Sequence, residues 1–146
     1  MKPGLAIALT AGAGGLVAMQ APINGVLGRT AGKLAAASIS FMIGTAVLLV
    51  ITLVSGSEVK LGEAAKLPWY YFTGGLLGAA YVTTVLITVR TLGAGGVTAA
   101  TIAGQLSTAV VLDRIGAFGL PEKHITLGRL IGVALLAAGV FLIVRE

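Results

Sequence analysis

The stretch LAAASISFMIGTAVLLVITLV, from Leu34 to Val54, decides the fold class, because it carries no charged residue and is long enough to cross a lipid bilayer. A membrane helix needs about 20 consecutive apolar residues at a rise of ~1.5 Å each. The whole chain has the same character, since 57% of its 146 residues are hydrophobic and 10% are charged. A soluble domain is roughly half apolar and a quarter charged. We therefore expect residues 1–146 to form a single transmembrane domain with lipid as its solvent.

Five apolar stretches of this kind follow one another, and each is expected to be helical because backbone groups in hydrocarbon must pair internally. The expected spans are about residues 3–27, 34–54, 68–89, 97–114 and 126–144. Lys2 and the apolar run after it also have the pattern of a signal peptide. The later spans make the chain polytopic in either case, so we interpret the first span as a retained helix. The predicted fold is all-α, with five transmembrane helices and the two termini on opposite sides.

The charges and the missing residue types exclude several classes of function. The ten Lys and Arg residues give a net charge of +5, but they fall singly between apolar runs, so a nucleic-acid-binding surface is not expected. The absence of Cys excludes disulfides and thiolate metal sites. His124 is expected to be a solvated loop residue. We find no Ser–His–Asp set, no paired catalytic carboxylates and no phosphate-binding loop, so we expect neither an enzyme nor a cofactor or metal.

The distribution of Lys and Arg between the two sides of the membrane is nearly even, and this distribution sets membrane orientation. On the side of the N-terminus lie Lys2, Lys60, Lys66, Arg114, Lys123 and Arg129. On the other side lie Arg29, Lys33, Arg90 and Arg145. Such a small bias predicts dual topology, in which the chain inserts both ways and pairs with an inverted copy of itself. The alternative is a modest preference for one orientation, with the N-terminus inside.

Polar side chains recur at helical spacing on one face of each of the first four spans. Gln20 and Asn24 form the pair in the first span, and the other stripes are Ser38, Thr45 and Thr52; Tyr81, Thr84 and Thr88; and Thr98, Thr101, Gln105 and Thr108. An amide facing lipid would cost several kcal/mol, roughly, so Gln20, Asn24 and Gln105 are expected to face protein or a wet cavity. Alternatively, the threonines bond their own helix carbonyls and the amides join helices, at ~0.6 kcal/mol per bond.

Pro22 lies between the two amides of the first span and leaves the carbonyl near Ala18 without its helical donor. We therefore predict a polar cavity near the membrane midplane, lined by the first four helices. Its expected substrate-binding residues are Gln20, Asn24, Trp69, Tyr81, Thr101 and Gln105. Trp69 is alternatively an interfacial anchor at the start of the third span. Without a charge at the midplane, the expected substrate is neutral or zwitterionic, or the uncharged part of an amphiphile.

Two further features concern the last two spans. Gly128, Gly132 and Gly139 share one face of the fifth span, and small residues let helices approach closely, so they predict a dimer interface. Asp113 lies at the membrane interface or about one turn inside it, followed by Arg114. A structural ion pair is one interpretation of Asp113, and uptake of a coupling proton or cation is the other.

Several strings in this chain resemble one family of membrane proteins. They are GGLVAMQAPINGVLGR, AAASISFMIGT, GGLLGAAYV, GQLSTAVVLDRIGAFG and GRLIGVALLAAGVFLI. They resemble the YdcZ-type inner-membrane exporters, five-helix members of the drug/metabolite transporter superfamily, over nearly the whole chain. The resemblance implies a multi-pass protein of the bacterial inner (plasma) membrane with an antiparallel two-fold arrangement. The related four-helix small multidrug resistance proteins carry a Glu in their first helix, where this chain has only small and apolar residues, Gln20 and Asn24.

The residues and the resemblance together predict a small-molecule transporter, an exporter that works as an antiparallel homodimer within the lipid bilayer. The first alternative is a non-transporting scaffold or partner subunit, in which the amides serve only to pack helices. The second is a passive channel, which differs from a transporter in that its flux does not saturate with substrate.

Overall fold

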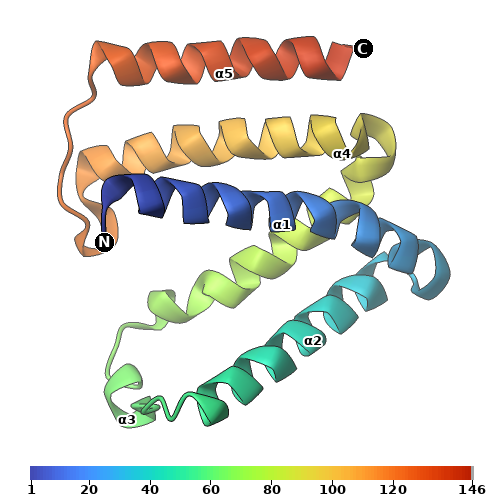
Figure 1. Ribbon diagram of the computed structural model, residues 1–146, viewed down its shortest axis with the longest axis vertical. Helices are drawn as coiled ribbons and strands as arrows, with labels where there is room; N and C mark the ends of the chain where they lie inside the picture. The colour runs from blue at the N-terminus through green and yellow to red at the C-terminus, as the bar shows by residue number, and fades with distance from the viewer. Residues whose placement is uncertain (146) are drawn as a thin grey trace. The chain divides into compact units, whose positions relative to one another are not determined.

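The computed structural model describes residues 1–145, and over that range every regular element is a helix. The long helices are α1 (Pro3–Ala31), α2 (Lys33–Val54), α4 (Gly74–Ile115) and α5 (Leu127–Arg145) (Figure 1). The short elements are α3 (Leu61–Ala64) and the 3₁₀ turns η1 (Trp69–Thr73) and η2 (Ala117–Gly119). The predicted all-α class is confirmed. Four helical segments are long and apolar enough to cross a membrane, and the longest of them is divided in two.

That division lies at Gly93, inside α4, where the backbone adopts φ 67° and ψ 172°. Gly32, with φ 90°, likewise separates α1 from α2. Only glycine adopts such positive φ angles without a steric penalty. Both links are shorter than the sequence predicts, since the helices continue up to these glycines. The reason is that helical pairing is the way to satisfy backbone groups within a membrane. With α4 counted as two halves, residues 1–145 contain five long apolar helices.

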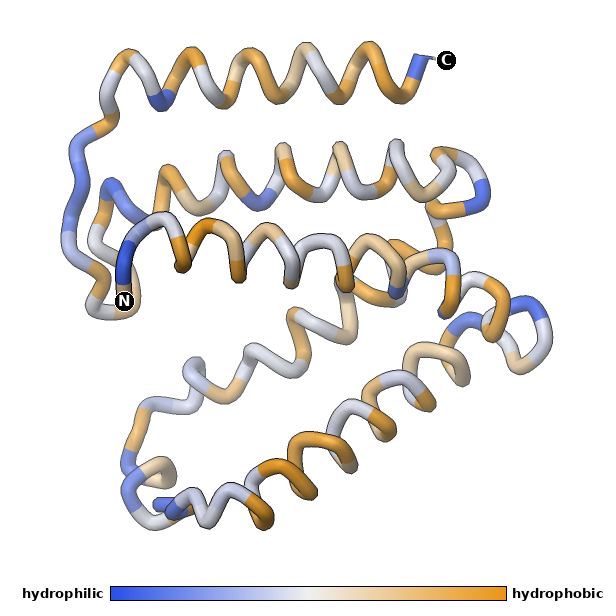
Figure 2. The backbone as a smooth tube through the Cα atoms, viewed as in Figure 1, coloured by the Kyte–Doolittle hydropathy of each residue, from blue (hydrophilic) through white to orange (hydrophobic). Residues whose placement is uncertain are grey.

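Large apolar side chains cover the outside of the helices. Figure 2 shows hydrophobic colours along the long helices and hydrophilic colours in the connections. On α2 the apolar side chains of Met42, Ile43, Leu49 and Val50 are exposed, and among the described residues of α5 none is buried. In water this apolar area would be strongly unfavourable, whereas in a bilayer it faces acyl chains. The burial pattern thus fits a chain whose solvent is lipid.

The helices pack in two units. The first, which we call the groove unit, is Met19–Arg90 and contains the end of α1, all of α2 and the first half of α4. The second, the hairpin unit, joins Met1–Ala18 to residues 91–145. The core of the groove unit consists of small and branched residues, with two larger ones packed against them: Ala36, Ala37, Val82 and Leu86, then Leu27 and Tyr81.

Close approach of helices in the groove unit depends on small residues, as is usual in membranes. Gly28 is buried, and a Cβ added to it would lie 3.5 Å from Leu86 and 3.7 Å from Ala36. In the hairpin unit, the second half of α4 and α5 run antiparallel. A Cβ on Gly96 would lie 3.5 Å from Val144, near the end of α5, and the start of α5 meets the end of α4.

Candidate functional site

A cavity of about 250 Å³ lies between α1 and α2, within the groove unit. Its lining residues are Gln20 from α1 and, from α2, Ser40, Phe41, Gly44, Thr45 and Leu48. We call this cavity the α1–α2 groove. The α2 residues recur at intervals of four, which places them on one face of the helix.

The groove is open at Gly44. A Cβ added to Gly44 would meet no atom within 4 Å, so space remains where another residue would place a side chain. The ring of Phe41 lies against α4, because a Cβ on Gly78 would lie only 3.3 Å from its Cζ. Phe41 therefore has a neighbour on α4, whereas no side chain fills the space at Gly44.

Asn24 and Gln20 lie one turn apart on α1 but have different surroundings. Asn24 is 6% exposed, and its Nδ2 donates a hydrogen bond to Ser40 Oγ at 3.2 Å. Gln20 is exposed to the groove, and within residues 1–145 its amide makes no hydrogen bond. The helix continues through Pro22 between them. Asn24 thus joins two helices, whereas the amide of Gln20 is free to bind a ligand.

Thr45 is one of the helix threonines whose hydroxyl does not bond within its own helix. Four others do, since Thr10, Thr52, Thr84 and Thr88 donate to the carbonyl four residues earlier. For these four the self-bonded interpretation is confirmed. Within the described part of the chain, Thr45 makes no such bond. Its hydroxyl therefore remains available on the surface of the groove.

The groove lies about halfway along its helices. Counted from Gly32, Gln20 is about 18 Å up α1, and Ser40 and Thr45 are about 12 and 20 Å up α2, at ~1.5 Å per residue. The hydrocarbon core of a bilayer is ~30 Å thick. Gln20, Ser40 and Thr45 are therefore separated from the Gly32 turn by roughly half of that thickness or a little more.

The other residues proposed for substrate binding lie outside the lining. Trp69 is 77% exposed in η1, where its ring makes an edge contact with Tyr70. Tyr81 packs against the core of the groove unit. Thr101 and Gln105 belong to the hairpin unit. The structure thus brings Gln20 and Asn24 together with α2, and the roles of Trp69, Tyr81, Thr101 and Gln105 in binding stay predictions.

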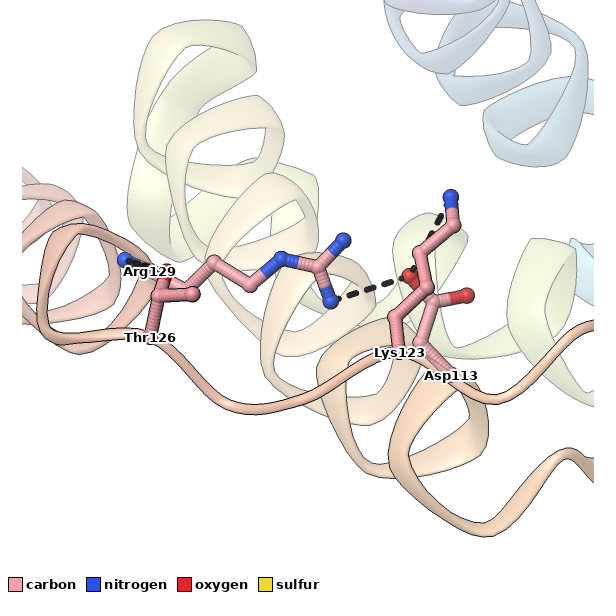
Figure 3. A network of polar contacts seen from close by, with 4 residues as sticks. All are labelled: Asp113, Lys123, Thr126 and Arg129. Carbon is pink, nitrogen blue, oxygen red and sulfur yellow. Dashed lines mark hydrogen bonds and ion pairs between the residues drawn. The ribbon is translucent and has the colours of Figure 1, made fainter.

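Asp113 is part of a charged cluster at the closed end of the hairpin (Figure 3). Its Oδ2 lies 3.2 Å from Arg129 Nη1 and 3.9 Å from Lys123 Nζ. The backbone N–H of Lys123 also donates to the carbonyl of Asp113, at 2.8 Å. Arg129 Nη1 is buried without a well-aligned hydrogen bond, so its contact with Asp113 is an ion pair. This geometry favours the structural interpretation of Asp113, and its role in coupling stays a prediction.

At the start of α5, the Arg129 N–H donates to Thr126 Oγ1 at 3.3 Å.

Around the three glycines predicted to form a dimer interface the space is open. A Cβ on Gly132 or Gly139 would meet nothing within 4 Å, and one on Gly128 would reach only Thr126 Oγ1 at 4.0 Å. The face of α5 that carries these glycines is therefore uncovered within one chain.

The chemistry of the groove is that of hydrogen bonding beside apolar walls. None of its lining residues is charged. No group of three His, Asp or Glu side chains placed to hold a metal occurs within residues 1–145. Sequence reasoning missed Ser40, Phe41, Gly44 and Leu48. The four-residue series Ser40, Gly44 and Leu48 is the signal that could have indicated this face of α2.

Comparison with known proteins agrees with this architecture. A family model described as "Putative inner membrane exporter, YdcZ" matches residues 5–142. Neither the curated proteins nor the solved structures contain a match. An exporter family is not an enzyme class, and together with the apolar helices it identifies a multi-pass protein of the inner membrane. Because the match covers nearly the whole chain, this protein belongs to the YdcZ family of inner membrane exporters.

Proposed function

We propose that this protein exports a small molecule through the α1–α2 groove. The observation that carries the proposal is the set of uncommitted polar groups there: the Gln20 amide and the Thr45 hydroxyl, which make no hydrogen bonds within residues 1–145, line an open cavity. Such groups in contact with lipid would be unfavourable. A bound substrate or water satisfies them, which is what a transport site requires.

The active form in this proposal is an antiparallel homodimer of dual topology. The near-even charge distribution, six Lys and Arg on one side and four on the other, supports insertion in both directions. The uncovered glycine face of α5 supports contact with a second copy, because small residues allow helices to approach closely. Two inverted copies then form the two-fold arrangement that larger transporters build from inverted repeats.

Transport is tested with purified protein in liposomes loaded with a water-soluble extract of bacterial metabolites, with release of each compound followed by mass spectrometry. Gly44→Leu is the blocking variant, since the added side chain enters the groove and meets no protein atom at its Cβ. Gly104→Leu is the matched control, because Gly104 also has open space at its Cβ and lies outside the lining.

We expect at least one compound to leave wild-type and Gly104→Leu liposomes faster than protein-free liposomes. Its release should fall to the protein-free level with Gly44→Leu and decrease with Gln20→Ala. Unchanged release by Gly44→Leu would contradict transport through the groove. If no compound requires the protein for release, the scaffold function is favoured, and the Asn24–Ser40 bond is the observation that fits it.

Antiparallel pairing is tested by disulfide crosslinking, which is clean because the chain has no Cys. Gly132 lies four residues before Leu136, the middle of α5 (Leu127–Arg145), and Gly139 lies three residues after it. In an antiparallel pair of α5 helices these two positions therefore face each other. Co-expressed Gly132→Cys and Gly139→Cys chains should form mixed dimers. Crosslinks between two copies of the same cysteine position, without mixed dimers, would show a parallel pair. Dual topology is tested separately with reporters fused to the C-terminus, and activity on one side of the membrane alone would contradict it.

A further inference from the structure

We propose that the α1–α2 groove selects an uncharged small molecule with neighbouring hydroxyl or amide groups beside a short apolar part; this rests on the proposed transport function. The first argument is the absence of charge from the lining. The charged residues nearest along the helices are also distant. At ~1.5 Å per residue, Arg29 lies about 14 Å from Gln20 along α1, and Lys33 lies about 10 Å from Ser40 along α2. An ion in the groove would thus be desolvated without a partner, which is strongly unfavourable.

The second argument is the kind of hydrogen bond on offer. Ser40 Oγ already accepts from Asn24 Nδ2, and within residues 1–145 its own proton is not donated to any carbonyl. Ser40 is therefore prepared to donate. Thr45 can donate and accept, and the Gln20 amide does both. A ligand hydroxyl or amide needs a donor and an acceptor close together, and these three groups offer both.

Asn24 acts in this arrangement as a positioning residue. It is too buried to line the groove, but its hydrogen bond occupies a lone pair of Ser40 and so determines what Ser40 can offer a ligand. Removal of Asn24 would let Ser40 turn to its own helix carbonyl, as serine and threonine commonly do in membrane helices.

The third argument is the size and the apolar side of the groove. A cavity of about 250 Å³ has room for on the order of eight waters at ~30 Å³ each. Phe41 and Leu48 supply its apolar surfaces, and the empty position at Gly44 admits a chain alongside α2. A short alkyl chain that ends in a diol fits this combination of groups.

The test uses three probes of equal chain length: hexane-1,2-diol, hexylammonium and hexanoate. A single cysteine, Gly44→Cys, reports on the groove through its rate of reaction with N-ethylmaleimide, and Gly104→Cys is the matched control outside the lining. Because the thiolate is the reactive form, labelling of Gly44→Cys requires water in the groove. A bound probe protects the thiol, so at ten times its Kd the rate falls about tenfold.

We expect the diol, but neither ion, to slow labelling of Gly44→Cys, and none of the probes to affect Gly104→Cys. Thr45→Val should raise the Kd of the diol by roughly two- to tenfold, the loss of one hydrogen bond. Thr52→Val is its control on the same helix, since Thr52 is bonded to Leu48 O, and it should leave the Kd unchanged.

Better protection by either ion, or equal effects of the two valine variants, would overturn the proposed ligand class and leave transport through the groove standing. A Gly44→Cys thiol that does not react at all would show a dry groove, and this result would overturn the proposed function together with the ligand class.

Discussion

The hydrogen bond between Asn24 and Ser40 joins α1 to α2 beside the groove, and its strength can be predicted from its surroundings. Side-chain hydrogen bonds between membrane helices contribute on average ~0.6 kcal/mol, with a maximum of ~1.7. The N···O distance of 3.2 Å is long for such a bond, and Asn24 is 6% exposed. We therefore expect a coupling energy near the average, about 0.6 kcal/mol, which is a factor of about three in the unfolding equilibrium.

A double-mutant cycle measures this coupling free of the effects of each truncation. The variants are Asn24→Ala, Ser40→Ala and the double variant, unfolded reversibly in mixed micelles with increasing SDS and followed by the fluorescence of Trp69, the single Trp of the chain. A coupling of zero, or one that is destabilising, would refute the assignment of Asn24 as an interhelical contact. A coupling of several kcal/mol would show that the bond has no competing partners in the unfolded state.

Three further predictions concern stability. Gly28→Ala should be tolerated, whereas Gly28→Leu should destabilise the protein by about 1–3 kcal/mol through overpacking, because a Cβ there already contacts Leu86 at 3.5 Å. The free energy of unfolding is measured in SDS, and equal stability of the two variants would contradict the packing. Gly93→Ala should destabilise the protein by a backbone strain on the order of 1–3 kcal/mol, because Gly93 has φ 67°. The thermal midpoint should therefore fall, and an unchanged midpoint would argue against the break in α4. Asp113→Asn should cost ~0.2–1 kcal/mol, decreasing with salt, because its ion pairs are partly exposed; a loss of several kcal/mol would indicate a buried pair.

The all-helical fold could be predicted from the sequence because the membrane leaves few alternatives. Uncharged runs such as Leu34–Val54 are long enough to cross a bilayer, and hydrocarbon requires that their backbone groups pair within the helix. The lengths of the connections were less predictable. Arg90 to Gly96 was expected to be a connector, yet a single residue, Gly93, leaves the helical conformation. Composition locates a break within a glycine-rich segment, but it does not indicate which glycine adopts the positive φ angle.

The site could be predicted only in part, because periodicity along one helix does not reveal which neighbour faces it. The spacing of Gln20 and Asn24 predicts one polar face on α1, and in the structure both residues lie next to α2. On α2 the predicted stripe included Thr45 but passed over Ser40, the partner of Asn24. The distinction between a self-bonded threonine such as Thr52 and an uncommitted one such as Thr45 depends on rotamers and neighbours. The spacing of residues in the sequence predicts neither the rotamer of a threonine nor its neighbours.

Glycine has opposite physical roles at two positions that look alike in the sequence. At Gly28 the missing side chain lets three helices meet, since an added Cβ would reach Leu86 and Ala36. At Gly44 the missing side chain is not replaced by a neighbour, and the space remains as part of a cavity. Both residues lie in apolar helices, so hydropathy cannot separate them. Because the lining of the groove has no charge, its capacity to bind depends as much on this empty volume as on Gln20 and Thr45. A large substitution such as Gly44→Leu should therefore disable the groove without loss of stability, whereas Gly28→Leu should act through stability.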